Sequence, residues 1–334
     1  MGKADAESGG TAAGPVPSGA RAVAPLVVLV AVAAAFRLLV GPRYLSPDSL
    51  SDIGQQAAII VIVGVGQTLV IISGGIDLSV GAVVAFCGTL AAVLMLHHGV
   101  PPAAAALVAV LAGGGIGLLN GFVTARTRLH PFIITLGAMM VFRGLALALT
   151  DAQNTRLLPD PFLALATGEF PLGPGKELYV PQILMLYILI VGAGAHWMLT
   201  RTRMGRYCFA IGSNAESCRL SGIRVDRWTT GYFVLAGLLF GFGGVIQAAR
   251  IRIGQPTGSE SMELEAIAAA VIGGTSLSGG QGSVLGTLFG ALLMAALRQG
   301  LRMSGHAPYW QTVSLGIAII VAVVYDRASR RGSR

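Results

Sequence analysis

The stretch RTRMGRYCFAIGSNAESCRLSGIRVDR, residues 201–227, is a polar island between two long apolar segments. It carries six arginines and only two acidic residues, Glu216 and Asp226. Basic residues in short loops beside membrane spans stay on the cytoplasmic side of the membrane. We therefore expect this stretch to be a cytoplasmic loop, and the direction of the spans on either side follows from it.

The middle of this loop predicts a short helix. Ser213 or Asn214 is a good N-cap for residues 215–220, Glu216 in the first turn complements the helix dipole, and Gly222 ends the helix. A capped helix of about two turns between two spans is suited to contact another subunit. A solvated basic loop that only fixes the topology is the alternative, and the charge alone does not separate the two.

Composition places the chain among membrane proteins. Of the 334 residues, 54% are hydrophobic and 11% are charged, and the mean hydropathy is +0.74. These values exclude a soluble domain. Much of the net charge of +8 lies in residues 201–227 and in the arginine-rich end of the chain, where it is typical of anchors near anionic lipid, so it indicates no nucleic-acid partner. Three cysteines, Cys87, Cys208 and Cys218, imply no disulfide framework.

We expect an all-α polytopic membrane protein with about ten transmembrane helices. Residues 1–20 predict a disordered cytoplasmic tail, residues 21–326 the transmembrane domain, and residues 327–334 a basic cytoplasmic tail. No small-residue cleavage site clearly follows the first apolar stretch, so we expect a span there rather than a signal peptide. The spans are placed at residues 22–40, 57–73, 78–96, 103–125, 131–149, 180–200, 229–248, 263–272, 283–297 and 310–325.

Ten spans with a cytoplasmic N-terminus put both termini and residues 201–227 inside, and the loop 151–179 outside. The segment 263–272 is short for a bilayer core of about 30 Å, and it needs the glycines after it, or a broken helix, to complete the crossing. Arg37 and Arg143 lie within the expected spans. We expect them to snorkel or to pair inside the bundle, with a functional buried charge as the alternative.

Two glycine-rich segments share the spacing GG-x-x-L-S-x-G: GGIDLSVG at 74–81 and GGTSLSGG at 273–280. Such clusters break helices and allow close backbone approach, and paired broken helices in the two halves of a chain indicate a transport pathway. The expected topology makes this repeat parallel. For Asp77 and Ser79, capping of the next helix is the competing role, and for Asp77 the favoured one. The candidate pathway residues are Gly74, Gly75, Asp77, Ser79, Gly273, Gly274, Ser276 and Ser278.

Catalytic and metal-binding patterns are absent from the sequence. No GxxxxGK[ST] pattern occurs, so the chain does not itself cradle ATP phosphates. The five histidines are scattered, with no HExxH or clustered Cys/His spacing. The tripeptide LSG at 277–279 is a weak indication of a membrane-embedded serine hydrolase, which needs a histidine at the same depth, whereas His306 falls in a loop. We expect no catalytic residue, metal or cofactor on this chain.

Three stretches resemble the ribose/monosaccharide class of bacterial ABC-importer permeases, and the likeness runs from about residue 44 to 325. They are GQTLVIISGGIDLSVGAVVAF (66–86), GRYCFAIGSNAESCRLSGI (205–223) and QPTGSESMELEAIAAAVIGGTSLSGGQGSVLGTLFGALL (255–293). The chain departs from the family where Ser217 and Cys218 replace two alanines, Met262 a tyrosine and Glu265 an aspartate. These changes are small or conservative, and they slightly weaken inferences about the neighbourhood of Met262.

The resemblance implies the ABC-importer permease fold, in the inner membrane of a bacterium, for a subunit that translocates a ribose-like or related sugar. It implies three partners: a cytoplasmic sugar-import ATPase that binds ATP, an extracytoplasmic solute-binding protein, and a second permease copy. By this likeness the short helix that fits into a cleft of the ATPase carries Asn214, Glu216, Arg219, Ser221 and Gly222.

Two other functions stay open at this point. One is a permease of the same superfamily for nucleosides or branched-chain amino acids, which the pair of glycine segments disfavours because the resemblance marks that pair as sugar-type. The other is the membrane-embedded hydrolase, which lacks a base. The sequence does not name the sugar, because selectivity in such systems rests mainly on the separate binding protein. Few acidic residues in the expected spans agree with a neutral substrate.

Overall fold

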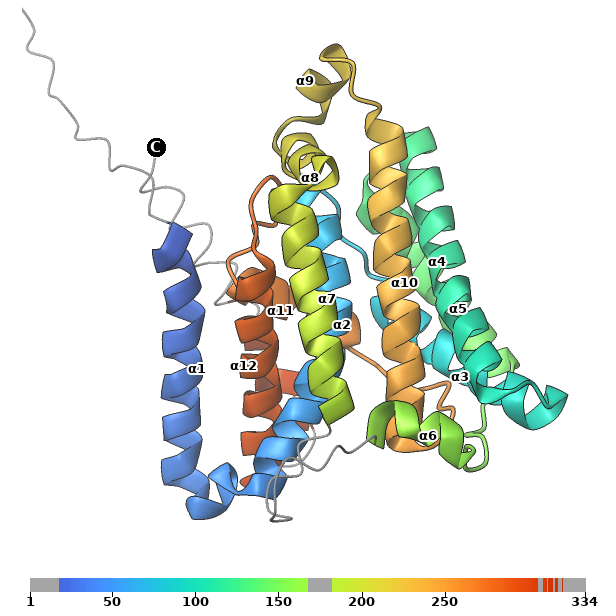
Figure 1. The fold of residues 1–334 in the computed structure, drawn as a ribbon, viewed down its shortest axis with the longest axis vertical. Coiled ribbons are helices and arrows are strands. Elements are labelled where there is room, and N and C mark those ends of the chain that lie inside the picture. The colour runs from blue at the N-terminus through green and yellow to red at the C-terminus, as the bar shows by residue number, and fades with distance from the viewer. Residues whose placement is uncertain are drawn as a thin grey trace, which may run out of the picture.

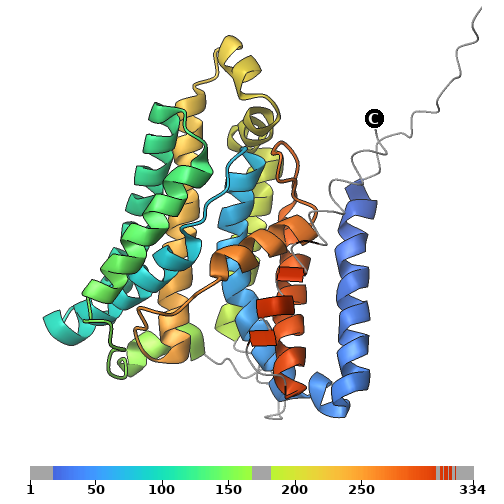
Figure 2. The same cartoon turned by 180° about the vertical axis from the view of Figure 1, so that it is seen from behind.

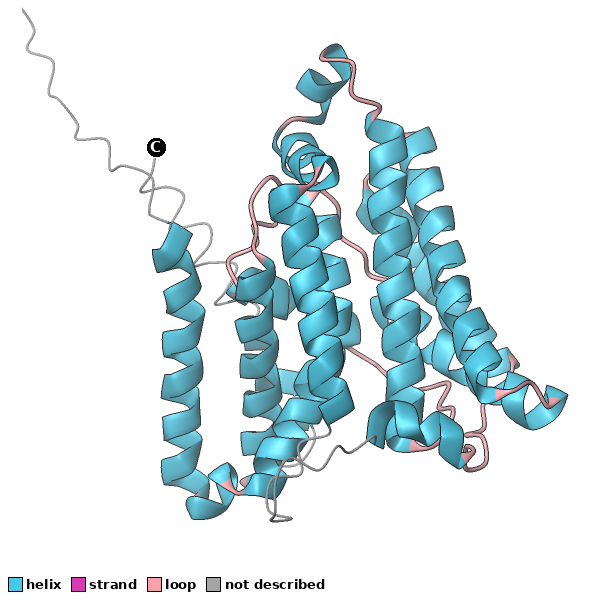
Figure 3. Cartoon of the chain, in the orientation of Figure 1, coloured by secondary structure: helices cyan, strands magenta, loops and turns pink. Residues whose placement is uncertain are grey.

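The computed structural model describes residues 18–167, 182–305, 309, 310, 312–314, 316, 317 and 320. Every regular element in these ranges is a helix (Figure 3). Most of the expected tail 1–20, most of the tenth span and the basic tail 327–334 lie outside the described residues. The elements are α1 (Ser18–Val40), η1 (Pro42–Leu45), α2 (Pro47–Ile72), α3 (Val80–His98), α4 (Pro102–Thr127), α5 (Pro131–Ala148), α6 (Asp160–Thr167), α7 (Gln182–Arg201), α8 (Arg203–Ser213), α9 (Ala215–Leu220), α10 (Val225–Ile251), α11 (Met262–Ile272) and α12 (Val284–Met303).

Seven of the described helices are long and apolar enough to cross a membrane: α2, α3, α4, α5, α7, α10 and α12. Each coincides with an expected span. The apolar part of α1, Pro25–Val40, is shorter, and α11 has only 11 residues, about 16 Å of helix. The segment 263–272, which was expected to be too short to span a bilayer, is therefore a short helix in the structure too. The seven long apolar helices make the chain a polytopic helical membrane protein.

α2 forms the centre of the bundle. Every residue from Ala57 to Ile72 is buried, and α7, α10, α11 and α12 all pack on this helix. It begins ten residues before the expected span at 57–73. The reason is local: Ser46 accepts a hydrogen bond from the N–H of Ser49 at 3.4 Å, and Pro47 occupies the first helical position.

α4 and α10 pack against each other backbone to backbone. Glycines recur every four residues on one face of α4, at Gly113, Gly117 and Gly121, and all three are buried. A Cβ added to Gly117 would collide with the backbone of Phe233 on α10, and one added to Gly113 would collide with the backbone of Gly237. Small residues at this spacing are the usual means of close helix packing in membranes, where apolar burial alone does not bring helices together.

The two ends of the molecule differ. α8 and α9 lie at one end of the bundle, while η1 and α6 lie at the other (Figure 1). α1 stands at the edge and packs on α12, and Phe36 on α1 fills the space beside Gly300 on α12. Seen from behind, the non-helical segment after α2 runs between the long helices to α3, and the segment before α11 rises from the end where α6 lies (Figure 2).

Candidate functional site

The segment between α7 and α10 forms two short helices, and α9 projects beyond the ends of the long ones (Figure 1). α9 begins after Asn214, whose side-chain oxygen accepts a hydrogen bond from the N–H of Ser217 at 2.9 Å. It ends at Leu220, and the turn that follows contains Gly222, which has a left-handed φ of +80°. The hydroxyl of Ser221 donates to the carbonyl of Ser217 at 2.9 Å. The predicted helix at 215–220 is confirmed, with Asn214 as its cap.

The charged side chains of α9 are arranged around Arg219. Its guanidinium pairs with Glu216 at 3.1 Å and with Asp226 at the start of α10 at 3.6 Å. Glu216 keeps 70% of its side chain exposed against 35% for Arg219, and Leu220 is 84% exposed. Arg219 therefore links α9 to the start of α10, while Glu216 and Leu220 keep most of their side chains exposed.

α8 is seated on the end of α2 and on the loop that follows α11. Gly212 lies so close to both that a Cβ there would collide with the carbonyl of Ile72 and sit 2.6 Å from the backbone nitrogen of Gly280. The N–H of Gly280 in turn donates to the Ile72 carbonyl at 2.8 Å. The thiol of Cys208 adds a hydrogen bond to the carbonyl of Leu69 at 3.5 Å. α8 therefore contacts both glycine segments.

α2 ends in a hydrogen-bonded turn around Gly74. Gly74, with φ +91°, donates its N–H to the carbonyl of Ile71 at 2.9 Å, and Gly75 donates to the carbonyl of Val70 at 2.9 Å. This pair of bonds is the Schellman ending, which needs a left-handed residue and so favours glycine. From here residues 75–79 run without helical structure to α3.

Side chains of α2, α4 and α5 satisfy this non-helical segment. The amide of Gln67, with its nitrogen towards the Asp77 carbonyl, makes two hydrogen bonds of 3.2 Å to the backbone of Asp77. The hydroxyl of Thr135 accepts the next N–H at 3.0 Å, and the amide of Asn120 donates to the Ser79 hydroxyl at 3.0 Å. Non-helical backbone at membrane depth is tolerated where protein buries and satisfies it.

The carboxylate of Asp77 serves the start of α3. It accepts hydrogen bonds from the N–H and the hydroxyl of Ser79 at 2.7 and 2.6 Å, and Asp77 is only 1% exposed. Asp77 therefore bonds the N-cap residue Ser79 and no N–H inside α3, and Ser79 itself makes no side-chain cap hydrogen bond, so neither side chain caps the helix directly.

α11 ends in the same kind of turn as α2. Gly274, with φ +87°, and Thr275 donate to the carbonyls three and five residues earlier, each at 2.9 Å. Gly74 and Gly274 are therefore equivalent in structure, whereas the spacing GG-x-x-L-S-x-G equates Gly74 with Gly273. The helix endings are therefore offset by one residue from the shared spacing, whereas the bonds from the Ser79 N–H to Asp77 and from the Ser278 N–H to Ser276 keep its register.

Gly273, Ser276 and Ser278 line the turn between α11 and α12. A Cβ on Gly273 would collide with the backbone of Gly286, so α11 and α12 touch through their backbones there. The hydroxyl of Ser276 accepts the N–H of Ser278 at 3.1 Å, and Ser276 is 1% exposed. Because the segments after α2 and α11 both reach α8, the structure brings the two glycine segments together with α8, and α9 follows directly.

The two intramembrane arginines differ in their surroundings. Arg143 on α5 donates to the carbonyl of Gly258 at 3.3 Å, in the loop before α11, as expected for a charge that pairs inside the bundle. Arg37 lies in the last turn of α1, where a long side chain reaches the membrane surface. Cys87, Cys208 and Cys218 are buried free thiols. Among the described residues, no cluster of three His, Cys, Asp or Glu side chains has a geometry suited to hold a metal ion.

Comparison with known proteins places this sequence in a family. The profile described as branched-chain amino acid transport system / permease component matches residues 49–323. A ribose import permease of Bacillus subtilis is 38% identical, over 90% of this chain and 89% of the relative. A fructose import permease of Rhizobium meliloti is 35% identical over 93% and 86%, and a D-allose transport system permease of Escherichia coli is 35% identical over 90% of each chain.

No solved structure matches the chain significantly. The profile match spans most of the chain, and the relatives align along about nine-tenths of it. The chain therefore belongs to this family of transport-system permease components.

Proposed function

We propose that this protein is the membrane subunit of an ABC importer that carries a monosaccharide across the bacterial inner membrane. The observation that supports this most is the position of α9, which projects on α8 while α8 rests on the ends of both glycine segments. A projecting helix linked to broken helices in the bundle is suited to turn a push from a cytoplasmic subunit into movement of the pathway.

The partners follow from this assignment. A cytoplasmic ATPase binds α9 and hydrolyses ATP, so the chain itself needs no cofactor. A solute-binding protein delivers the sugar at the opposite end, where α6 and η1 lie. A second copy of the chain completes a homodimeric channel, which the mass of the detergent-purified complex tests directly.

Closure of the ATPase dimer around ATP draws the two copies of α9 together. Gly212 on α8 contacts both Ile72 and Gly280. That motion therefore reaches the end of α2 and the loop between α11 and α12 at the same time. We propose that α2 and α12 then rock between inward-open and outward-open arrangements, and the sugar passes from the binding protein into the cavity.

A sugar is favoured over the alternative substrates. The family profile is named for branched-chain amino acid transport, but relatives at 35–38% identity are named for ribose, fructose and allose. Sequence identity along nearly the whole chain outweighs the name of a broad profile. The hydrolase alternative has no support, since the relatives are named as permeases.

Proteoliposomes test the function directly. The permease is reconstituted with the ATPase and binding protein encoded beside it, and uptake of labelled ribose, fructose, allose, xylose, leucine and adenosine is measured. We expect ATP-dependent uptake of at least one monosaccharide, and none when the ATPase carries an inactive Walker motif. Uptake of leucine or adenosine with none of the sugars would contradict the proposal.

A further inference from the structure

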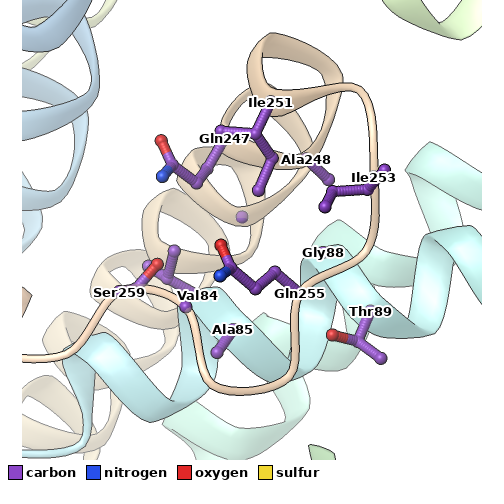
Figure 4. A pocket seen from close by; sticks show the side chains of 12 residues that line it. Val84, Ala85, Gly88, Thr89, Gln247, Ala248, Ile251, Ile253, Gln255 and Ser259 are labelled. Carbon is purple, nitrogen blue, oxygen red and sulfur yellow. The ribbon is translucent and has the colours of Figure 1, made fainter. Parts of the chain in front are cut away.

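Two hollows of different size lie along α10. The hollow beside α3 and the loop before α11 (Figure 4) offers only about 10 Å3 of free space, which is room for about one water molecule. The hollow beside α4 offers about 380 Å3. Of the two, this second hollow, called the α4–α10 cleft from here on, is the one large enough for a ligand.

The α4–α10 cleft lies one helical turn beyond the last of the α4 glycines that touch α10. A Cβ on Gly121 would lie 2.8 Å from the Cα of Thr230, and after this contact larger side chains follow on α4. The end of α4 and the start of α10 lie at the same end of the bundle as α8 and α9 (Figure 1). The cleft is lined by Phe122, Ala125, Arg126, Asp226, Arg227 and Thr230.

Two arginines line the cleft from its two sides. Arg126 lies in the last turn of α4, and Arg227 lies in the first turn of α10. Both are exposed, and neither guanidinium forms an ion pair or a hydrogen bond with another described residue. The carboxylate of Asp226 is paired with Arg219 on α9 at 3.6 Å. The opening therefore presents two cations that the described part of the chain does not neutralise.

An exposed apolar stripe on α4 leads up to Arg126. Leu111, Leu118, Phe122 and Arg126 follow one another at spacings of seven, four and four residues, which places them on one side of the helix. The three apolar side chains keep more than half of their surface exposed. A phospholipid has the same order of groups, because its acyl chains lie in the bilayer core and its phosphate lies at the surface.

We propose that the α4–α10 cleft binds an anionic phospholipid, with Arg126 and Arg227 on the phosphate and an acyl chain along Phe122 and Leu118. Guanidinium groups bind phosphate through two parallel N–H donors and stay charged at every physiological pH. The inference is independent of the transported substrate, since it rests only on the membrane location of the chain. It adds a lipid site next to Asp226, the residue that links α10 to α9.

A second copy of the chain is the competing occupant of this face. It would have to bring carboxylates to the two arginines. The exposed acidic side chains on α9 and at the start of α10 are Glu216 and Asp226, and both already pair with Arg219. A lipid phosphate needs no such rearrangement, and the apolar stripe below the arginines fits a chain that lies along one helix.

Native mass spectrometry of the full-length permease tests the site. The detergent-purified protein is stripped of lipid and titrated with dioleoyl phosphatidylglycerol. Each basic residue near an anionic headgroup adds enough attraction to predict about fivefold weaker binding for Arg126→Gln and for Arg227→Gln. Asp226→Asn should act in the opposite direction and tighten binding by up to about fivefold, because it removes a negative charge from the lining. A general loss of structure would not produce these opposite signs.

Arg206→Gln is the matched control. Arg206 on α8 is also exposed, and it does not line the cleft, so its loss removes the same charge from the same end of the molecule. Its affinity for phosphatidylglycerol should equal that of the wild type. Both cleft variants should melt at the wild-type temperature without lipid, because their guanidinium groups lose no partner among the described residues.

Two further ligands identify the source of the phosphate. Dioleoyl phosphatidylcholine has the same chains without net charge and should bind at least about fivefold more weakly. Glycerol 3-phosphate has the phosphate without the chains and should not displace bound phosphatidylglycerol at equal concentration. Displacement by it would identify a site for a free phosphate ester, which overturns the lipid assignment.

The remaining outcomes also decide the inference. Wild-type affinity in both Arg126→Gln and Arg227→Gln means that the cleft does not hold the headgroup. An equal loss in Arg206→Gln means that the overall charge of this end attracts the lipid, so no specific site exists. Conversion of a dimer to a monomer by the two cleft variants, seen in the same spectra, makes this face a contact between copies. Each of these results overturns the lipid site.

Discussion

Arg298 on α12 forms an ion pair with Glu265 on α11, and the carboxylate end of the pair is buried inside the bundle. Glu265 is only 2% exposed. One residue further along α12, the amide of Gln299 donates to Asp52 on α2 at 3.2 Å and to Ser49 at 3.3 Å. These contacts join α2, α11 and α12 towards the end of the molecule away from α9, while α8 contacts the other end of α2 and the loop after α11.

Arg298→Met should destabilise the folded permease. It leaves Glu265 as an unpaired buried carboxylate, at a cost of about 3 kcal/mol. The double variant Glu265→Leu/Arg298→Met removes both charges and should recover most of that loss. The free energy of unfolding in detergent, followed by thermal or denaturant melting, measures both effects.

Arg302→Met provides the control for this pair. Arg302 lies one turn later on α12, is exposed, and makes a single hydrogen bond to Gln56 at 3.3 Å. Its loss should change stability by less than about 0.5 kcal/mol. Equal stability of the Arg298 and Arg302 variants would show that the buried pair contributes nothing specific.

The two glycine segments should be sensitive to side chains for different reasons. At Gly75 a Cβ would lie 3.1 Å from Val70 and 3.4 Å from Pro131, so Gly75→Leu overcrowds the packing. At Gly274 a Cβ meets nothing within 4 Å, and the cost of Gly274→Leu comes from the left-handed backbone, about 1–2 kcal/mol. We expect both leucine variants to abolish uptake.

Gly274→Asn distinguishes these causes, because asparagine tolerates the left-handed region better than other side chains. It should retain more uptake than Gly274→Leu, measured per permease molecule in the membrane. Normal uptake by both leucine variants at normal expression would show that the two glycine segments have no role in transport.

Local signals made much of this fold predictable. Apolar length located seven spans, and the cap at Asn214 with the stop at Gly222 located α9, because caps and glycine stops act within a few residues. The glycines of α4 at spacing four, Gly113, Gly117 and Gly121, were also a readable signal for close packing. The α4–α10 contact is absent from the sequence predictions, although this spacing indicates it.

Other features depend on contacts that sequence spacing does not contain. The Arg298–Glu265 pair and the contact of Gly212 with Ile72 and Gly280 join residues on separate helices. The one-residue offset between the glycine segments follows from which residue takes the left-handed angle, which the repeated letters do not reveal.

The orientation of the bundle in the membrane is testable with two exposed positions at opposite ends. Ser213 at the end of α8 and Thr167 at the end of α6 are both exposed and lie at opposite ends of the molecule (Figure 1). In a background without the native cysteines, a membrane-impermeant maleimide should label a cysteine at 167 in intact cells and one at 213 only after lysis. Labelling at 213 in intact cells contradicts a cytoplasmic α9.

The coupling role of α9 is tested at Glu216, the exposed acidic residue of this helix. Glu216→Lys places a second positive charge beside Arg219 and offers a lysine to the groove that would receive the carboxylate. Sugar uptake and transport-stimulated ATP hydrolysis should both fall at least about tenfold. The permease should still reach the membrane, because an exposed ion pair adds only about 0.2–1 kcal/mol to stability.

The charge-swapped variant Glu216→Lys/Arg219→Glu/Asp226→Arg identifies what the charge does, because Arg219 pairs with both acidic residues. It rebuilds both ion pairs but presents the charges in reverse to the ATPase. If Glu216 only stabilises α9, the swap restores coupled hydrolysis; if a groove on the ATPase reads the carboxylate, hydrolysis stays low. If complexes of the Glu216→Lys single variant assemble with the ATPase and keep wild-type coupled hydrolysis, that result contradicts the coupling role. It would show that α9 only fixes the topology.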